Sequence, residues 1–181
     1  MKSKNVSVVF PTLVGLLLGL LQTGLFFQLT LSMSSGFMTY LLITLCWLAG
    51  SAIGVKYIAQ RQVSSRFLLI LMTIVYLTIA WIVTRQPFNT QLVPLYGSLI
   101  VLGGFYPGVF FARLSKVYTA RMLFFWENNG FILGVVLATL LFMILGRTSL
   151  IVLPVSVACV IWWFDSPTRY YMQISLKYPQ P

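Results

Sequence analysis

The chain has 181 residues, of which 59% are hydrophobic and only 8% are charged, and its formal net charge is +10. A soluble domain usually carries about 25% charged residues, so this composition excludes an ordinary water-soluble protein. The basic residues are spaced singly between apolar runs and build no patch, which argues against a nucleic-acid-binding surface.

Six apolar segments approach the length of about 20 residues with which a helix crosses the hydrocarbon layer of a bilayer. In chain order they cover residues 8–31, 37–59, 67–84, 93–114, 122–145 and 149–164. The first follows a basic start and shows no small-residue cleavage site, so we expect an uncleaved span. The sequence therefore predicts an all-α bundle of six transmembrane helices in residues 1–165, followed by a short cytoplasmic tail, 166–181.

The basic residues predict how these spans are oriented. If the N-terminus is inside, the inside segments hold ten Lys and Arg residues and the outside segments hold two, Arg85 and Arg147. The ten are Lys2, Lys4, Lys56, Arg61, Arg66, Arg113, Lys116, Arg121, Arg169 and Lys177. Because short cytoplasmic loops carry the excess of Lys and Arg, both termini are expected in the cytoplasm. The expected location is the cell membrane, with a bacterial inner membrane as its setting.

Pairs of glycines four residues apart recur in these segments. They are Gly15/Gly19, Gly50/Gly54, Gly104/Gly108 and Gly130/Gly134, in the first, second, fourth and fifth segments. Residues four apart share a helix face, so each pair makes a groove that another backbone approaches closely. We expect these four helices to pack tightly, with the third and sixth outside them. The pattern also suggests a three-plus-three repeat, the construction of each half of a major-facilitator transporter.

One acidic residue, Glu127, lies well inside an apolar segment. It follows Arg121 by six residues, about 9 Å along a helix. It shares a face with the glycines at 130 and 134, so its carboxyl is expected to point toward a neighbouring helix. An ionisable group in a span is a candidate functional site. Two interpretations stay open: pairing with Arg113 or Arg121 to pin helices, which we favour, and binding of a proton or cation during transport.

Uncharged polar residues and a proline complete the candidate site. Asn128 and Asn129 directly follow the acidic residue, and Gln22 and Gln28 lie in the first segment. Such amides form hydrogen bonds between helices or line a cavity. Pro107 removes a backbone hydrogen bond from the fourth segment and predicts a kink there.

The sequence offers no signature of catalysis or of cofactor binding. It has no histidine, no glycine-rich phosphate loop and no pairing of a nucleophile with a base. Its two cysteines lie inside apolar runs, where small packing residues are common. We therefore expect a protein that is not an enzyme and that carries neither a cofactor nor a metal.

Two stretches resemble a known family. The quoted residues are Gly104-Phe105-Tyr106-Pro107-Gly108, Phe111-Ala112-Arg113-Leu114, Ala120-Arg121, Glu127-Asn128-Asn129-Gly130 and Gly134, with Ser35-Gly36, Thr39-Tyr40-Leu41-Leu42, Trp47, Gly50 and Gly54 before them. They are similar to the membrane region of spermidine-synthase-like proteins fused to major-facilitator-like helices. The resemblance implies a six-helix, half-transporter arrangement. The synthase domain of that family is absent, and the loop at 54–66 lacks the aspartate of the major-facilitator signature.

The function expected from these features is non-enzymatic. The leading hypothesis is a membrane-embedded subunit or accessory module that packs with other membrane proteins or with itself. Its partners are then the lipid bilayer and a membrane protein or a second copy, and not a nucleic acid. The alternative is a small-molecule or ion transporter that works as a homodimer, with Glu127, Gln22 and Gln28 at its site.

Overall fold

The computed structural model describes residues 8–33 and 35–164, and within these ranges the chain is all-helical, without a strand. The helices are α1 (Val9–Met33), α2 (Gly36–Ile53), α3 (Ser65–Arg85), α4 (Val93–Gly103), α5 (Phe105–Leu114), α6 (Ala120–Leu145) and α7 (Ser149–Phe164). A π-helical turn, η1 (Gly54–Ile58), extends α2, and the 3-10 turns η2 (Thr90–Leu92) and η3 (Gly146–Thr148) precede α4 and α7. The all-α prediction is confirmed. The predicted tail, 166–181, and four of the counted cations, Lys2, Lys4, Arg169 and Lys177, lie outside the described residues.

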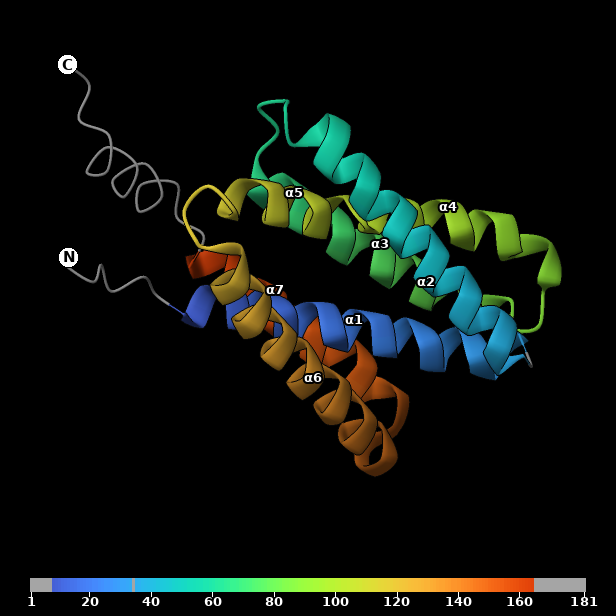
Figure 1. Ribbon diagram of the computed structural model, residues 1–181. Coiled ribbons are helices and arrows are strands. Elements are labelled where there is room, and N and C mark those ends of the chain that lie inside the picture. The colour runs from blue at the N-terminus through green and yellow to red at the C-terminus, as the bar shows by residue number, and fades with distance from the viewer. Residues whose placement is uncertain (1–7, 34, 165–181) are drawn as a thin grey trace, which may run out of the picture.

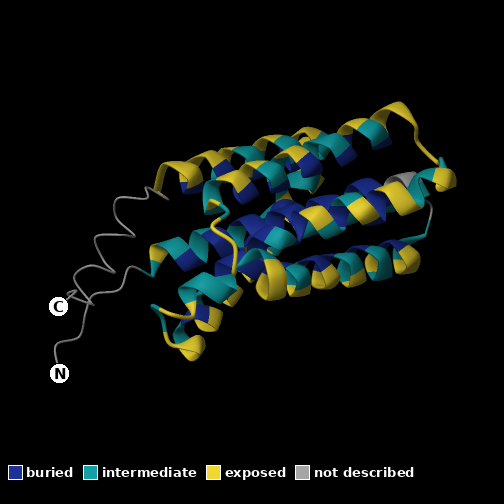
Figure 2. Cartoon of the chain, turned by 90° about the horizontal axis from the view of Figure 1, so that it is seen from above, coloured by how far each residue is buried: buried dark blue, intermediate teal, exposed yellow. Residues whose placement is uncertain are grey.

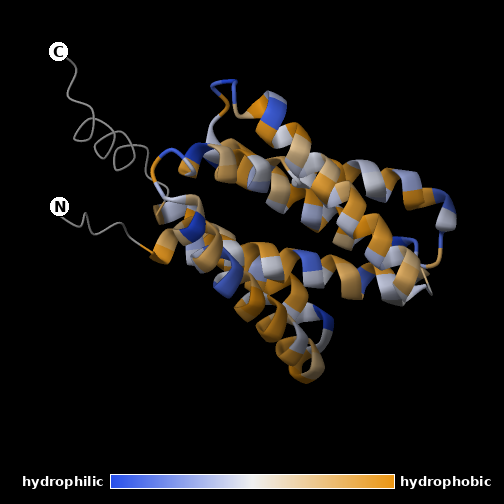
Figure 3. Cartoon of the chain, in the orientation of Figure 1, coloured by the Kyte–Doolittle hydropathy of each residue, from blue (hydrophilic) through white to orange (hydrophobic). Residues whose placement is uncertain are grey.

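Five helical stretches of the described residues are long and apolar enough to cross a membrane. They are Val9–Thr30, Gly36–Ile58, Ser65–Arg85, Thr90–Leu114 and Ala120–Phe164. The last has 45 residues and contains α6, η3 and α7, which the sequence had predicted as two separate spans. α7 alone has 16 residues, about 24 Å of helix, against a hydrocarbon layer of about 30 Å. Figure 3 shows that hydrophobic residues predominate along these helices and that hydrophilic residues are frequent at the connections.

A sharp turn at Gly146 separates α6 from α7. This glycine ends α6 with φ 67° and ψ −153°, a conformation that a residue with a side chain rarely adopts. The chain reverses there, and α7 returns to pack against α1 and α3 (Figure 1). α6 and α7 therefore form a helical hairpin.

α1 lies at the centre of the molecule, between two groups of helices. The α6–α7 hairpin packs on one side of it, and α2 to α5 lie on the other (Figure 1). Its most extensive contact is with α6, and it also touches α2, α3 and α7. Buried residues line the inner faces of the helices, while the exposed residues face outward (Figure 2).

α3 is also internal, contrary to the expectation that the third and sixth helices lie outside the other four. It packs against α1, α4, α5 and α7 and buries eight residues. They are Leu68, Leu69, Met72, Val75, Tyr76, Ile79, Ala80 and Val83. For the third helix the expectation was wrong, because glycine pairs mark where backbones approach closely, whereas α3 is buried by large apolar side chains that fill wider spaces.

The connections fall at two ends of the bundle. The connections at 59–64 and 115–119 lie at the same end as the start of α1 and the end of α7 (Figure 1). Arg61 and Lys116 belong to these connections. The guanidinium of Arg66, at the start of α3, lies 5.1 Å from the ring centroid of Trp162, near the end of α7. The basic segments that were assigned to one side of the membrane are thus close together in space.

Candidate functional site

Two of the four glycine pairs meet where α1 crosses α6. A Cβ added at Gly15 would overlap the carbonyl oxygen of Glu127, and one added at Gly19 would overlap that of Phe131. From the other side, a Cβ at Gly134 would lie 3.1 Å from the Cα of Gly19. Backbone therefore rests directly on backbone, as the glycine spacing predicted.

The other two pairs meet where α2 and η1 cross α4 and α5. A Cβ at Gly50 would lie 2.9 Å from the Cα of Gly104, and a Cβ at Gly54 would lie 3.2 Å from the Cα of Gly108. The helix of the fourth segment is interrupted at this crossing, where Gly104 separates α4 from α5 three residues before Pro107. The hydroxyl of Ser51 donates to the carbonyl oxygen of Gly104 at 3.2 Å. The predicted kink coincides in position with this interruption.

Glu127 is placed at the first crossing, with its side chain turned inward. Its exposed fraction is 9%, while its neighbours Asn128 and Asn129 are exposed. The prediction that the carboxyl points toward a packed helix is confirmed. Within residues 8–33 and 35–164 the carboxyl has no ion-pair partner.

In the described part of the chain, neither of the two arginines that were expected to pair with this acid forms an ion pair with it. The guanidinium of Arg113 donates to the hydroxyl of Ser65 at 2.9 Å and to the carbonyl oxygens of Val63 at 2.6 Å and Arg61 at 3.2 Å. These bonds tie the end of α5 to the connection between α2 and α3. Arg121 is exposed at the start of α6. Neither residue pins Glu127 in this structure.

The two glutamines of α1 differ in their surroundings. Gln28 is 1% exposed, and its Nε2 donates to the hydroxyl oxygen of Tyr76 on α3 at 2.8 Å. Gln22 is only partly buried. The difference follows from the helix face, since positions 21, 25 and 28 face the core and position 22 lies beside it.

The hydroxyl of Tyr76 links three helices. It accepts from Gln28 on α1 and donates to the carbonyl oxygen of Leu150 on α7. Gly24 makes room for it, because a Cβ there would overlap the Tyr76 hydroxyl oxygen. The sequence reasoning missed Tyr76, although a tyrosine in the middle of an apolar segment is itself a signal of a buried hydrogen bond.

Pro154 explains why the carbonyl of Leu150 accepts a bond from outside its own helix. In α7 the amide of residue 154 would donate to the carbonyl of residue 150, but proline has no N–H. In a bilayer such a freed carbonyl must find another donor, because lipid supplies none. The hydroxyl of Tyr76 is that donor.

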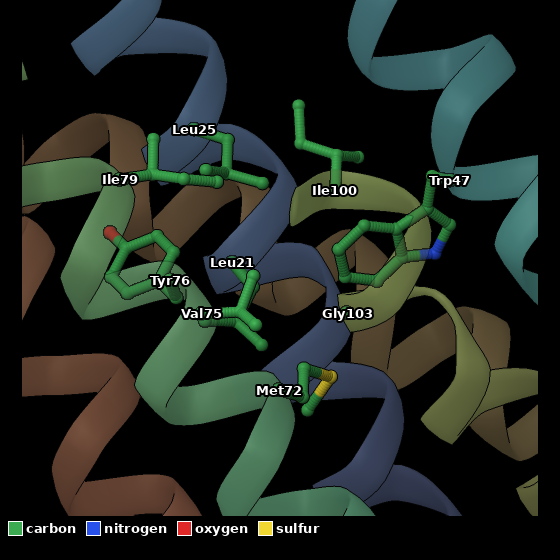
Figure 4. Close-up of a pocket in the computed structure, with 9 residues that line it drawn as sticks. All are labelled: Leu21, Leu25, Trp47, Met72, Val75, Tyr76, Ile79, Ile100 and Gly103. Carbon is green, nitrogen blue, oxygen red and sulfur yellow. The ribbon is translucent and has the colours of Figure 1, made fainter. Parts of the chain in front are cut away.

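A small cavity lies between α1, α2, α3 and α4 (Figure 4). The wall that it presents is apolar. The lining residues are Leu21, Leu25, Trp47, Met72, Val75, Tyr76, Ile79, Ile100 and Gly103. Its volume is about 10 Å³, close to the least that holds one water molecule. The cavity is too small for an organic substrate.

The candidate residues are not gathered into one site. Glu127 lies against Gly15, whereas Gln28 follows Gly15 by 13 residues, about 20 Å along α1. Glu127 therefore lies at the α1–α6 crossing, whereas Gln28 lies farther along α1, where it bonds to Tyr76. No group of three acidic, cysteine or histidine side chains that could hold a metal occurs in the described part of the chain.

No family model, curated protein or solved structure matches this chain. What the geometry of the described residues offers is helix packing: two glycine crossings, the hydrogen bonds of the Tyr76 hydroxyl and the buried carboxyl of Glu127.

Proposed function

We propose that the chain is a non-enzymatic, membrane-embedded module of six crossing helices that acts by packing against partner membrane proteins or a second copy. The observation that carries this proposal is the attachment of the α6–α7 hairpin. It rests on the chain mainly through α1, with smaller contacts to α3. Most of its remaining surface is apolar and open, including Ile132, Val136, Met143, Val152 and Trp163.

Six crossings are supported by the turn at Gly146 and by the charges. The hairpin brings the end of α7 back to the end of the molecule where α1 begins (Figure 1). Six crossings also place Arg85 and Arg147 opposite the basic connections, as the positive-inside rule favours. α7 is short, and local thinning of the bilayer or anchoring by Trp162 and Trp163 accommodates such a span.

The half-transporter arrangement is supported by the helix pairs. In a three-plus-three repeat, spans one, two and three correspond to spans four, five and six. The crossing of span one with span five, α1 with α6, then corresponds to the crossing of span four with span two, which is α4 and α5 with α2. In the same way, the α1–α7 contact corresponds to the α3–α4 contact. All of these pairs are in contact. This correspondence favours a three-plus-three construction and the major-facilitator-like resemblance.

The test is the size of the particle that leaves the membrane. We expect extraction in a mild detergent, followed by light scattering on a gel-filtration column, to give an assembly larger than 20.4 kDa of protein. A folded monomer, with no second chain after chemical crosslinking in the intact membrane, would contradict the proposal.

The buried carboxyl of Glu127 favours a second candidate, a dimeric transporter of a small molecule or ion. An acid inside a span without an ion pair is a candidate proton or cation site. In proteoliposomes, Glu127→Gln is then expected to abolish substrate-driven flux while the protein still folds. Unchanged flux in that variant would exclude Glu127 from the site.

A further inference from the structure

The outward face of α6 carries the amide of Asn128, which the described residues leave without a hydrogen bond. Asn128 is exposed, and its carboxamide has no hydrogen-bond partner in residues 8–33 and 35–164. It sits in a ridge of exposed residues spaced four apart: Phe124, Asn128, Ile132, Val136 and Leu140. Apolar residues on both sides of an amide place it in a surface that faces lipid.

The depth of Asn128 makes the missing partner costly. Arg121 and Arg147 bracket α6 and are 26 residues apart, about 39 Å along the helix. Asn128 follows Arg121 by seven residues, about 10 Å, so it lies below the interface. An amide in hydrocarbon without a hydrogen bond is unfavourable, which drives it toward a polar group on another helix.

The neighbouring asparagine shows the contrast. The Nδ2 of Asn129 donates to the carbonyl oxygen of Phe125 at 2.6 Å, within α6 itself. Asn129 is equally exposed and one residue away, yet its amide has a donor bond inside its own helix. It therefore serves as a matched control for Asn128.

We propose that the ridge of Asn128 is a self-association surface, on which α6 of a second copy packs in parallel so that the two Asn128 carboxamides bond to each other. Two copies inserted in the same orientation carry Asn128 at the same depth. A two-fold axis along the membrane normal brings identical residues together. A carboxamide is both donor and acceptor, so two of them satisfy one another.

This inference rests on the proposed function, because it names the second copy as what covers part of the open α6–α7 surface. A helix of a different protein would need a polar group at the same depth. A second copy of this chain meets that requirement automatically, because its own Asn128 lies at the same depth. Residues at four-residue spacing also form the ridges by which helices interlock.

Site-directed crosslinking in the membrane tests the surface. In a background with Cys46→Ala and Cys159→Ala, we expect Asn128→Cys and Ile132→Cys each to form a disulfide-linked dimer on mild oxidation. Ile74→Cys is the control, because Ile74 is 55% exposed on α3 and lies nine residues into its helix, at a depth similar to that of Asn128. That position is expected to stay monomeric.

The amide's contribution is measured by the dimer dissociation constant in lipid vesicles, using energy transfer between labelled copies. Asn128→Leu is expected to weaken association about 3- to 20-fold, the range for hydrogen bonds between membrane helices. Asn129→Leu is expected to leave the constant unchanged. Both side chains are exposed, so folding is expected to survive either change.

Three outcomes overturn the inference. They are equal crosslinking at positions 74 and 128, an equal effect of Asn128→Leu and Asn129→Leu, and a photocrosslinker at 128 that captures a different protein instead of a second copy. The last outcome excludes a second copy as the partner of this ridge but is compatible with the proposed function as a packing module. A monomer that forms no photocrosslink from position 128 or from any exposed position of α6 and α7 excludes both the self-association surface and the proposed packing function.

Discussion

At the scale of single residues, Pro154 and Tyr76 show how a helix breaker is accommodated between apolar helices. Pro154 deprives the carbonyl of Leu150 of its donor within α7, and the hydroxyl of Tyr76 supplies one from α3. Gln28 completes the arrangement by donating to the same hydroxyl. One tyrosine oxygen therefore holds α1, α3 and α7 in register.

Removing the Tyr76 hydroxyl is expected to destabilise the fold by about 1–3 kcal/mol, because Tyr76→Phe leaves a buried carbonyl unsatisfied. Pro154→Ala restores the N–H that serves this carbonyl within α7. Tyr76→Phe is therefore expected to cost less stability in the Pro154→Ala background than in the wild-type background. Reversible unfolding in mixed micelles, run as a double-mutant cycle, measures the difference. Additive effects of the two changes would contradict the assigned role of the hydroxyl.

The sequence predicted the burial of Gln28 but not its partner. A glutamine in an apolar segment signals a hydrogen bond, whereas its partner depends on which helices become neighbours. Glu127 shows the same limit: its face on α6 followed from its spacing to Gly130 and Gly134. Its expected pairing failed because Arg113 turns toward Val63 and Ser65 instead.

At the scale of elements, the glycine pairs determine which helices approach most closely. Each crossing joins two parallel helices, and each is closed by glycines from both sides. The spacing of four residues is local, so sequence alone predicted the faces. It did not predict that α1 takes α6 as its partner, or that α3 is internal, because large apolar side chains leave no comparable periodic mark.

Adding one methyl group at a crossing is expected to push two helices apart. Gly19→Ala places its Cβ against the carbonyl of Phe131, which cannot move without moving α6. We expect a loss of about 1–3 kcal/mol, typical of overpacking. Gly103→Ala is the control, because its Cβ would meet only side-chain atoms at ordinary contact distances, Val75 Cγ1 at 3.7 Å and Met72 Cγ at 3.9 Å.

The same unfolding assay in mixed micelles compares the two alanine variants. Gly103→Ala is expected to be neutral or to stabilise by up to about 1 kcal/mol, since alanine favours a helix more than glycine does. Equal losses of stability in both variants would show that the α1–α6 crossing tolerates an added methyl group as well as an ordinary helix position does, which would contradict the prediction.

At the scale of the whole molecule, the turn at Gly146 decides how many times the chain crosses. Length and composition make Ala120–Phe164 one apolar stretch of 45 residues. The positive φ of Gly146 and the packing of α7 on α1 and α3 divide it into a hairpin. The sequence signalled this division through Gly146-Arg147-Thr148, a short polar interruption between two apolar runs.

The two ends of the bundle are distinguishable by labelling single cysteines on intact cells. In a background with Cys46→Ala and Cys159→Ala, cysteines at the exposed positions Gln86 and Thr148 are expected to react with a membrane-impermeant maleimide. Cysteines at Gln62 and Ser115, also exposed, are expected to react only after the membrane is permeabilised. This pattern is what the proposed six crossings predict, because they would alternate the connections between the two sides and keep the basic ones in the cytoplasm.

The reactivity of a cysteine at position 148 distinguishes six crossings from four. If α6 and α7 each cross the bilayer, Thr148 lies on the same side as Gln86, and both react from outside. If the hairpin enters the membrane and α6 fails to reach the far side, position 148 stays unreactive in intact cells while position 86 reacts. That result would reduce the number of crossings to four. It would also leave Arg147 inside the bilayer, where its charge would need a partner that this hairpin does not supply.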